Sequence, residues 1–330
     1  MSNIRIPKGW EIDESLATPE SSYLNRRRFL RQAGIAGLGA LAVATGCGGA
    51  PAETTPQTAP RAAGGIAPPD SWKSLYPATR ATKYTLDRAL TDESVAARYN
   101  NFYEFTTDKE GVAALAAKFP YYPWQVEVTG LVKTPKTYGI DDLLELVPLE
   151  ERLYRHRCVE AWAMAVPWTG IPFAALIKKL EPLSGAKFVR LVSFQKPELA
   201  PGQAMQTWYS WPYYEGITMA EATNELAFLA TGIYGHPMPM QHGAPIRLVT
   251  PWKYGYKSIK SIVKIEFVEA QPHTFWNDLV PDEYGFVSNV NPAVPHPRWS
   301  QASERLIDTG ERVPTRPFNG YSEFVASLYA

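Results

Sequence analysis

The sequence predicts one α+β domain whose mixed sheet is connected by long, ordered loops. Short helical and strand patterns interleave without a regular βαβ rhythm. The 330 residues contain no internal repeat, heptad pattern, GxGxxG motif or P-loop. The 10 Trp, 18 Tyr and 29 Pro are typical of irregular but ordered connections over a densely packed interior.

The regular elements are predicted from hydrophobic spacing. Apolar residues at helical spacing predict helices over residues 141–146 and 173–180, and the pair Glu181-Pro182 ends the second helix. Segments rich in β-branched and aromatic residues predict strands over 126–132, 188–194, 246–250 and 262–268.

Charge excludes some functions. Lys+Arg and Asp+Glu each total 33, so the chain lacks the strong field expected of a protein that binds nucleic acid or a membrane surface. The 45% of hydrophobic residues is an ordinary globular share. Chemistry must therefore be sought in particular segments.

The N-terminus has the features of an export signal. Residues 25–31 (NRRRFLR) resemble the twin-arginine motif, and the Gly/Ala-rich apolar stretch over 33–46 is too short to span a bilayer as a mature helix. An amphipathic helix is the alternative, but the stretch lacks helical periodicity. The twin-arginine route carries folded proteins. Residues 1–47 are therefore expected to be the signal peptide of a periplasmic protein that receives its cofactor before export.

The end of this signal allows two interpretations. Ala44-Thr45-Gly46-Cys47 resembles a lipobox, although Ala44 stands where Leu is usual. Residues 48–68, rich in Gly, Pro, Ala and Thr, predict a flexible tether. The tether suits a protein anchored by lipid through Cys47 as well as a cleaved signal with a loose mature start.

Cys158 has no disulfide partner in the folded body, because the other cysteine, Cys47, lies in the signal. It belongs to residues 154–162 (YRHRCVEAW). A thiolate suits a redox metal, and the neighbouring Arg155 and Arg157 favour the deprotonated form. Free cysteines are also commonly small buried hydrophobes. The residues alone leave both interpretations open.

A second segment is basic. Residues 245–264 include five basic residues and no acid. Backbone N–H groups at Gly255 and Ser258 can approach an anion that Lys257 and Lys260 neutralise, which fits a phosphate-bearing cofactor. A solvated basic face is the alternative.

Two further segments combine aromatic and polar groups. Residues 99–105 (YNNFYEF) can line a pocket or form an ordinary strand and turn. Near the C-terminus, residues 281–286 (PDEYGF), 289–291 (NVN) and 296–301 (HPRWSQ) can line a pocket or form a well-packed loop.

These four segments, in this order and spacing, resemble the molybdenum-containing catalytic subunits of the periplasmic protein-methionine-sulfoxide reductases, within the sulfite oxidase fold superfamily. The strings RCVEAW (157–162) and PWKYG (251–255) are the most specific, and the resemblance extends to FNGY (318–321). It implies a single sulfite-oxidase-type molybdopterin domain over 69–330, without a dimerisation domain, in a monomeric protein.

The resemblance also implies a site. One molybdenum per chain is expected, held by the dithiolene of one molybdopterin and by the thiolate of Cys158. The family's molybdopterin contacts map onto Asn100, Tyr103, Glu104, Ser193, His242, Arg247, Ser258, Ile259 and Lys260. Ser193 and Ser258 replace a threonine and a glycine but keep a hydroxyl or an available N–H. His242 replaces an asparagine. It either tunes the cofactor by titrating or only substitutes as a hydrogen-bonding group.

The implied reaction is reduction of methionine sulfoxide in oxidised periplasmic proteins by oxygen-atom transfer, which repairs oxidative damage. Glu160 and Trp299 are catalytic candidates on the substrate side. The alternatives are that Glu160 pairs with an arginine and that Trp299 belongs to the core. The sequence lacks CxxCH, flavin, nicotinamide and iron–sulfur motifs. The resemblance therefore implies that a haem b, quinol-oxidising membrane subunit supplies electrons by transient contact.

Two other functions compete with this one. A dehydrogenase of sulfite or a related sulfur compound uses the same fold and metal in the opposite direction, but such enzymes commonly append an immunoglobulin-like dimerisation domain. A non-catalytic exported binding lipoprotein uses the tether and a pocket, and predicts no molybdenum in the purified protein.

Export is expected to depend on the arginine pair. Replacing Arg26 and Arg27 with Lys should leave folded, cofactor-loaded protein in the cytoplasm, because cofactor insertion precedes transport. Cell fractionation measures this outcome. Normal periplasmic delivery of the double variant would contradict the twin-arginine assignment.

Overall fold

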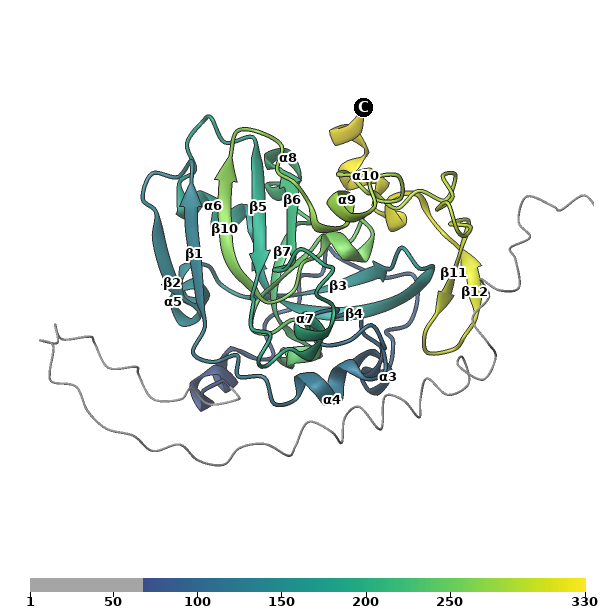
Figure 1. The fold of residues 1–330 in the computed structure, drawn as a ribbon, viewed down its shortest axis with the longest axis horizontal. Helices are drawn as coiled ribbons and strands as arrows, with labels where there is room; N and C mark the ends of the chain where they lie inside the picture. The colour runs from purple at the N-terminus through teal and green to yellow at the C-terminus, as the bar shows by residue number, and fades with distance from the viewer. Residues whose placement is uncertain (1–67) are drawn as a thin grey trace, which may run out of the picture. The chain divides into compact units, whose positions relative to one another are not determined.

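The computed structural model describes residues 68–330. The predicted signal peptide over 1–47, the lipobox at Cys47 and the predicted tether up to residue 67 lie outside the described residues. The described chain has the predicted α+β fold, with two mixed sheets whose strands run in different directions (Figure 1). No helix within this part of the chain is both long and apolar enough to cross a membrane.

The strands are β1 (Gln125–Gly130), β2 (Lys136–Gly139), β3 (Glu150–Arg157), β4 (Trp162–Pro172), β5 (Phe188–Ser193), β6 (Tyr214–Thr218), β7 (Phe228–Ile233), β8 (His236–Pro237), β9 (Arg247–Val249), β10 (Ile262–Val268), β11 (Ser303–Leu306) and β12 (Arg312–Pro314). The α-helices are α3 (Glu93–Arg98), α4 (Val112–Ala116), α5 (Ile140–Leu146), α6 (Phe173–Leu180), α7 (Pro201–Met205), α8 (Met219–Ala222), α9 (Phe275–Leu279) and α10 (Ser322–Val325). The 3-10 helices are η2 (Asp70–Leu75), η3 (Met240–His242), η4 (Gly255–Lys257), η5 (Pro317–Gly320) and η6 (Ala326–Tyr329).

The first sheet has the strand order β2-β1-β10-β5-β6. Only β1 and β10 are parallel, and the other neighbours are antiparallel. The second sheet has the order β12-β11-β4-β7-β8, with β3 paired to β4 and β9 paired to β7. Its one parallel pair is β11 with β4. The sequence predicted one mixed sheet, and the structure has two, each with parallel and antiparallel pairs.

The helices and strands predicted from hydrophobic spacing are confirmed. Helices α5 and α6 and strands β1, β5, β9 and β10 occupy the six predicted segments to within two residues at each end. Helix α6 buries Phe173, Leu176, Ile177 and Leu180. It ends at Glu181, which adopts a left-handed conformation (φ 52°, ψ 60°) before Pro182.

Strands β3 and β4 were not predicted, although they form the longest hairpin of the described chain. Strand β3 (EERLYRHR) does not alternate between polar and apolar residues, because three of its arginines are buried. Strand β4 is buried along almost its whole length, so it reads as a continuous apolar run rather than an alternating one. The hairpin matters for function because its turn includes Cys158.

Gly170 allows β4 and β7 to approach closely where their register shifts. A Cβ atom at this position would lie 2.1 Å from the carbonyl oxygen of Leu229 and 2.7 Å from Cα of Ala230, and neither backbone can move away easily. The hairpin that holds the Cys158 turn therefore requires glycine here.

Gly170→Ala is expected to lower the stability of the folded chain by at least about 2 kcal/mol through overpacking. This corresponds to a fall in Tm of about 4–8 °C for a chain of this size. Differential scanning calorimetry at matched cofactor content measures it. Gly285→Ala is the control, because a Cβ there meets nothing within 4 Å. Equal melting temperatures for the two variants would contradict the packing argument.

Candidate active site

A cavity of about 110 Å³ lies where the turn between β3 and β4 meets the segments 100–104 and 255–260. The predicted site residues that line it are Asn100, Tyr103, Glu104, Cys158, Glu160, Arg247, Ser258, Ile259 and Lys260. Three predicted site residues are not among the lining residues: Ser193, His242 and Trp299. The structure thus brings the β3–β4 turn and the segments 100–104 and 255–260 together around one cavity.

Cys158 is the first residue of the turn that joins β3 to β4. Its backbone N–H donates to the carbonyl oxygen of Trp162 at 2.9 Å, and its carbonyl accepts from the N–H of Ala161 at 3.0 Å. Ala161 closes the turn with a positive φ of 62°. The Sγ atom of Cys158 accepts from Nδ2 of Asn101 at 3.4 Å and from the N–H of Glu160 at 3.5 Å. The thiol is thereby fixed on the cavity wall.

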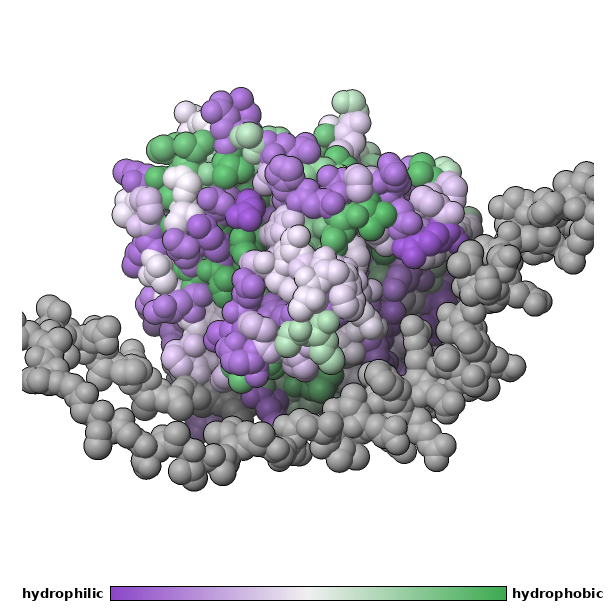
Figure 2. Space-filling model, viewed as in Figure 1, coloured by the Kyte–Doolittle hydropathy of each residue, from purple (hydrophilic) through white to green (hydrophobic). Residues whose placement is uncertain are grey.

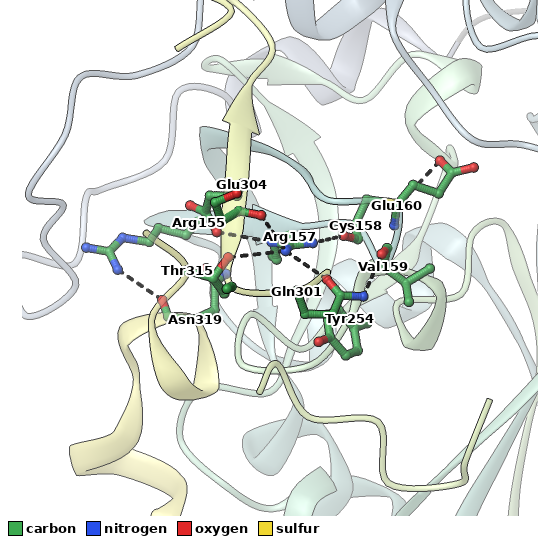
Figure 3. Close-up of polar contacts among 12 residues, drawn as sticks. Arg155, Arg157, Cys158, Val159, Glu160, Tyr254, Gln301, Glu304, Thr315 and Asn319 are labelled. Atoms are coloured by element: carbon green, nitrogen blue, oxygen red, sulfur yellow. Dashed lines mark hydrogen bonds and ion pairs between the residues drawn. The ribbon is translucent and has the colours of Figure 1, made fainter. Parts of the chain in front are cut away.

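The two arginines near Cys158 do not line the cavity, and only Arg157 contacts the turn. The guanidinium of Arg157 binds Glu304 at 3.1 Å and Gln301 at 2.8 Å, and it also donates to the carbonyl of Cys158 (Figure 3). Arg155 pairs with Asp87. Both side chains are buried in these contacts.

The predicted effect of the arginines on Cys158 is present for Arg157, but burial of the thiol outweighs it. Burial raises the pKa of the Cys158 thiol above its ordinary value, and the carboxylate of Glu160 raises it further. Arg157 and Lys109 lower the pKa of this thiol, but by less. The thiolate form needs another positive charge at Sγ, which is what a metal ion supplies.

Glu160 is held as a carboxylate at the cavity wall. Its carboxylate accepts from Nδ2 of Asn101 at 3.0 Å and from Nε1 of Trp162 at 3.2 Å, and it pairs with Nζ of Lys109 at 3.1 Å. Burial acts to raise the pKa of Glu160, but these hydrogen bonds and the charge of Lys109 together lower it below its ordinary value. The partner of Glu160 is a lysine, not an arginine.

Two cations, buried Arg247 and half-buried Lys260, lie at the cavity without a carboxylate partner in the described chain. Arg247 donates to the carbonyl oxygens of His242 at 2.9 Å and Ser258 at 2.8 Å. Lys260 donates to the carbonyl oxygens of Asn101 at 2.9 Å and Gln241 at 2.7 Å. Burial lowers the pKa of Arg247 to about 9, and burial and Arg247 lower that of Lys260. Uncompensated buried cations are costly, so this end of the cavity favours an anion.

Lys257 does not play the role predicted for it. Its Nζ lies 2.5 Å from the carboxylate of Glu215 and 2.8 Å from the carbonyl of Gly216, and the ion pair is fully buried. Lys253 pairs in the same way with Glu221. The basic segment is therefore divided: Lys253 and Lys257 stabilise the interior, whereas Lys260 and Arg247 remain for an anion.

Glu104 and Ser193 form a polar pair beside the cations. Burial raises the pKa of Glu104 to about 7, against the charge of Lys260 and a hydrogen bond from Ser193. Ser193 also donates to the carbonyl oxygen of Ser261 at 3.4 Å. Ser193 does not line the cavity itself, and it contacts the lining residue Glu104 from behind.

His242 lies behind the wall as well. Burial lowers the pKa of its ring well below the ordinary value, and the charges of Lys260 and Arg247 act in the same direction. The ring contacts Trp168 edge-on, and Nδ1 is buried without a hydrogen-bond partner. A neutral imidazole with an unpartnered nitrogen fits a hydrogen-bonding substitute better than a titrating group.

Trp299 contacts the turn from outside the cavity. Its Nε1 donates to the carbonyl oxygen of Val159 at 2.7 Å, and its ring stacks on His296 at 3.8 Å between centroids. The side chain is half-buried. In this position Trp299 supports the residue next to Cys158.

Sequence reasoning missed several cavity residues. Asn101 and His156 lie inside segments that were singled out, but nothing distinguished them from their neighbours. Asn101 also has a buried Oδ1 atom with no hydrogen-bond partner within residues 68–330, a second polar group that fits a ligand. Two aromatic lining residues, Tyr256 and Tyr284, lie in segments that the sequence singled out, whereas Tyr213 and Trp276 come from separate elements without a local pattern.

The donor set fits a metal and a phosphate-bearing cofactor. Within residues 68–330, no group of three or more His, Cys, Asp or Glu side chains could hold a metal ion by itself. The predicted approach of an anion to the N–H of Ser258 is not present, because this N–H donates to the carbonyl oxygen of Gly255 at 3.1 Å. One thiol and two cations without a carboxylate partner in the described chain fit molybdopterin with molybdenum.

Comparison with known proteins agrees with this geometry. Residues 116–276 match the family model of the oxidoreductase molybdopterin binding domain. Among solved structures, the sulfane dehydrogenase SoxCD of Paracoccus pantotrophus matches 62% of this chain and 54% of its own, with 13% identity and a TM-score of 0.41. That likeness is too low to support any inference by itself.

Curated relatives are much more similar. The protein-methionine-sulfoxide reductase catalytic subunit MsrP of Burkholderia mallei (strain ATCC 23344) is 46% identical over 97% of this chain and 94% of its own length. The protein of the same name from Xanthomonas axonopodis pv. citri (strain 306) is 46% identical over 97% and 95%. This chain therefore belongs to the family of protein-methionine-sulfoxide reductase catalytic subunits, with a molybdopterin-binding domain of the sulfite oxidase type.

Proposed function

We propose that this chain reduces methionine sulfoxide in proteins to methionine, using one molybdenum–molybdopterin per chain. The observation that carries the proposal is that one cavity brings the Cys158 thiol together with two cations, Arg247 and Lys260, that have no carboxylate partner within residues 68–330. Relatives that are 46% identical over almost the whole chain are named for this activity. Reduction of the sulfoxide removes a polar group from apolar surfaces and so restores their packing.

Each side of the cavity has a distinct task in this proposal. Cys158 is the protein's ligand to molybdenum, and Arg247 and Lys260 neutralise the phosphate of molybdopterin. The remaining proposed contacts to molybdopterin are Asn100, Tyr103, Glu104, Ser193, His242, Ser258 and Ile259. Ser193 and His242 contribute from behind the wall, by holding other side chains in position.

Molybdenum on molybdopterin supplies two-electron oxygen-atom transfer when bound. The sulfoxide oxygen leaves as water after two electrons and two protons are supplied. Glu160, fixed by Asn101 and Lys109, is proposed to face the substrate as a carboxylate that can accept and return a proton. Trp299 is proposed to position the turn through the carbonyl of Val159.

The electrostatics of the cavity disfavour sulfite as the substrate. A small dianion requires several free cationic donors. Arg155 and Arg157 are engaged with Asp87 and Glu304 and do not line the cavity. The two cations that do line the cavity, Arg247 and Lys260, are assigned to the cofactor phosphate, and the lining also includes several aromatic side chains, which suit an apolar thioether stem.

The proposal includes the protein's surroundings. The chain is exported by the twin-arginine route and works in the periplasm on oxidised proteins, as a monomer, either released from its signal or anchored by lipid through Cys47. Electrons come from a haem b, quinol-oxidising membrane subunit. The sequence motifs of residues 25–31 and 44–47 support this placement.

The direction of the reaction is tested by paired assays on one preparation of known molybdenum content. With an artificial low-potential reductant, methionine sulfoxide, free or in a peptide, is expected to cause reductant consumption. With sulfite and an oxidised dye, little dye reduction is expected. Rapid sulfite oxidation without sulfoxide-dependent consumption would overturn the proposed reaction, and protein without molybdenum would favour a binding lipoprotein.

Cys158→Ala is the control for these assays. Turnover should disappear while the fold stays intact, because a small side chain is removed but the metal loses its only protein sulfur ligand. Circular dichroism and elemental analysis separate loss of structure from loss of metal. Full activity in this variant would exclude the proposed ligation.

A further prediction contrasts Lys260, which has no carboxylate partner in the described chain, with Lys257, which pairs with Glu215. Lys260→Met should lower the molybdopterin content of purified protein at least about tenfold, because a charge-assisted contact is lost. The same change should leave the cofactor-free protein at least as stable as the unmodified one.

Lys257→Met is the matched control. It leaves Glu215 unpaired and should lower the stability of the cofactor-free protein by about 3–5 kcal/mol. Chemical denaturation and cofactor extraction measure both effects. A larger loss of stability in Lys260→Met than in Lys257→Met, or a larger loss of molybdopterin in Lys257→Met, would contradict the proposed role of Lys260.

A further inference from the structure

A long uncharged segment lies beside the cavity. Residues 200–214 (APGQAMQTWYSWPYY) contain no charged side chain, although 20% of the whole chain is charged. Met205 is 64% exposed and Trp208 is 68% exposed, the highest values among the large hydrophobic residues of the described chain. Figure 2 shows pale, weakly polar residues gathered in front of α7, between more hydrophilic areas. Exposed apolar surface of this kind commonly marks a binding site.

This segment is continuous with the cavity through aromatic contacts. The ring of Trp208 lies 5.7 Å from that of Tyr209, measured between centroids, and Tyr209 lies 5.9 Å from Trp276. Trp276 in turn lies 5.3 Å from Tyr103. Both Trp276 and Tyr103 line the cavity. A row of packed rings thus leads from solvent to the site of the reaction. The name α7 aromatic surface refers below to Met205 of α7, to the two rings that follow it, Trp208 and Tyr209, and to Trp276 of α9, which packs against Tyr209.

Helix α7 is bound firmly to the cavity wall. The backbone N–H of Gln203 donates to the carbonyl of Glu104 at 3.0 Å, and Nε2 of Gln206 donates to the carbonyl of Tyr103 at 2.8 Å. Gly202 approaches so closely that a Cβ atom would lie 2.1 Å from the same carbonyl of Tyr103. The surface is therefore preorganised with respect to the cavity, which lowers the entropic cost of binding.

We propose that the α7 aromatic surface binds the polypeptide segment that flanks the oxidised methionine of a protein substrate. This inference rests on the proposed function. A cavity of about 110 Å³ that also serves the cofactor admits a side chain, so the main chain of the substrate must lie across its mouth. Uncharged aromatic side chains pack against peptide planes and apolar side chains without selecting charge. Oxidised methionines occur in many sequence contexts, and this surface suits an extended segment of varied sequence.

The test compares a large substrate with a small one. Trp208→Ala is assayed with an artificial reductant, using free methionine sulfoxide and an unstructured, uncharged peptide that has one central methionine sulfoxide. We expect kcat/KM for the peptide to fall about tenfold, through KM, because an anchoring aromatic contact is lost. We expect kcat/KM for free methionine sulfoxide to stay unchanged. The peptide value should also change little with salt.

Leu183→Ala is the control, since Leu183 is 48% exposed and does not line the cavity. It should change neither substrate's kinetics. Equal effects of Trp208→Ala on both substrates, or no effect on either, would overturn the surface assignment. So would unchanged peptide kinetics combined with slower reduction by a membrane electron donor, since the surface would then serve that donor. Failure of the unmodified enzyme to reduce either sulfoxide would instead contradict the proposed function.

Discussion

The guanidinium of Arg157 joins three separate parts of the chain beneath the turn that carries Cys158. It binds Glu304 of β11, Gln301 of the preceding loop, Thr315 after β12 and the carbonyl of Cys158 itself (Figure 3). The side chain is fully buried, and removing one partner of such a pair commonly costs about 3–5 kcal/mol. Strands β11 and β12, which look peripheral in Figure 1, are thereby coupled to the position of the thiol.

A second constraint is the imbalance of charge around the cavity. Lys253 and Lys257 are neutralised by Glu221 and Glu215, so their burial is tolerated without a ligand. Within residues 68–330, Lys260 and Arg247 form no ion pair and instead contact carbonyl oxygens and the ring faces of Phe102 and Trp168. Placing an anion here relieves a cost that folding alone leaves in place. Stability and cofactor binding are therefore linked in one set of residues.

The sequence predicted six of the regular elements, among them α6 and β10, where buried apolar residues recur at the spacing of a helix or a strand. It failed for β3 because the arginines of that strand are buried by partners as distant in sequence as Glu304. Local pattern could not show which lysines of the basic segment are free, since Glu215 and Glu221 lie outside it. Cys158, Arg247 and Lys260 were found because they belong to compact motifs. The aromatic lining was only partly anticipated: Tyr284 belongs to a segment that the sequence offered as a pocket lining or a loop, whereas Tyr213 and Trp276 come to the cavity only in the folded chain.

Arg247 and Lys260 also link the presence of a bound anionic ligand to the stability of the folded chain. A ligand that binds only the folded state stabilises it in proportion to the logarithm of its concentration over its Kd. In the proposed function molybdopterin binds at Arg247 and Lys260, so chains that hold it would be less often unfolded than empty ones. An export machinery that accepts only folded cargo would sort mature holoenzyme from unfinished molecules by this difference alone. In the proposed function, the two side chains that bind the cofactor would therefore also make export depend on its presence.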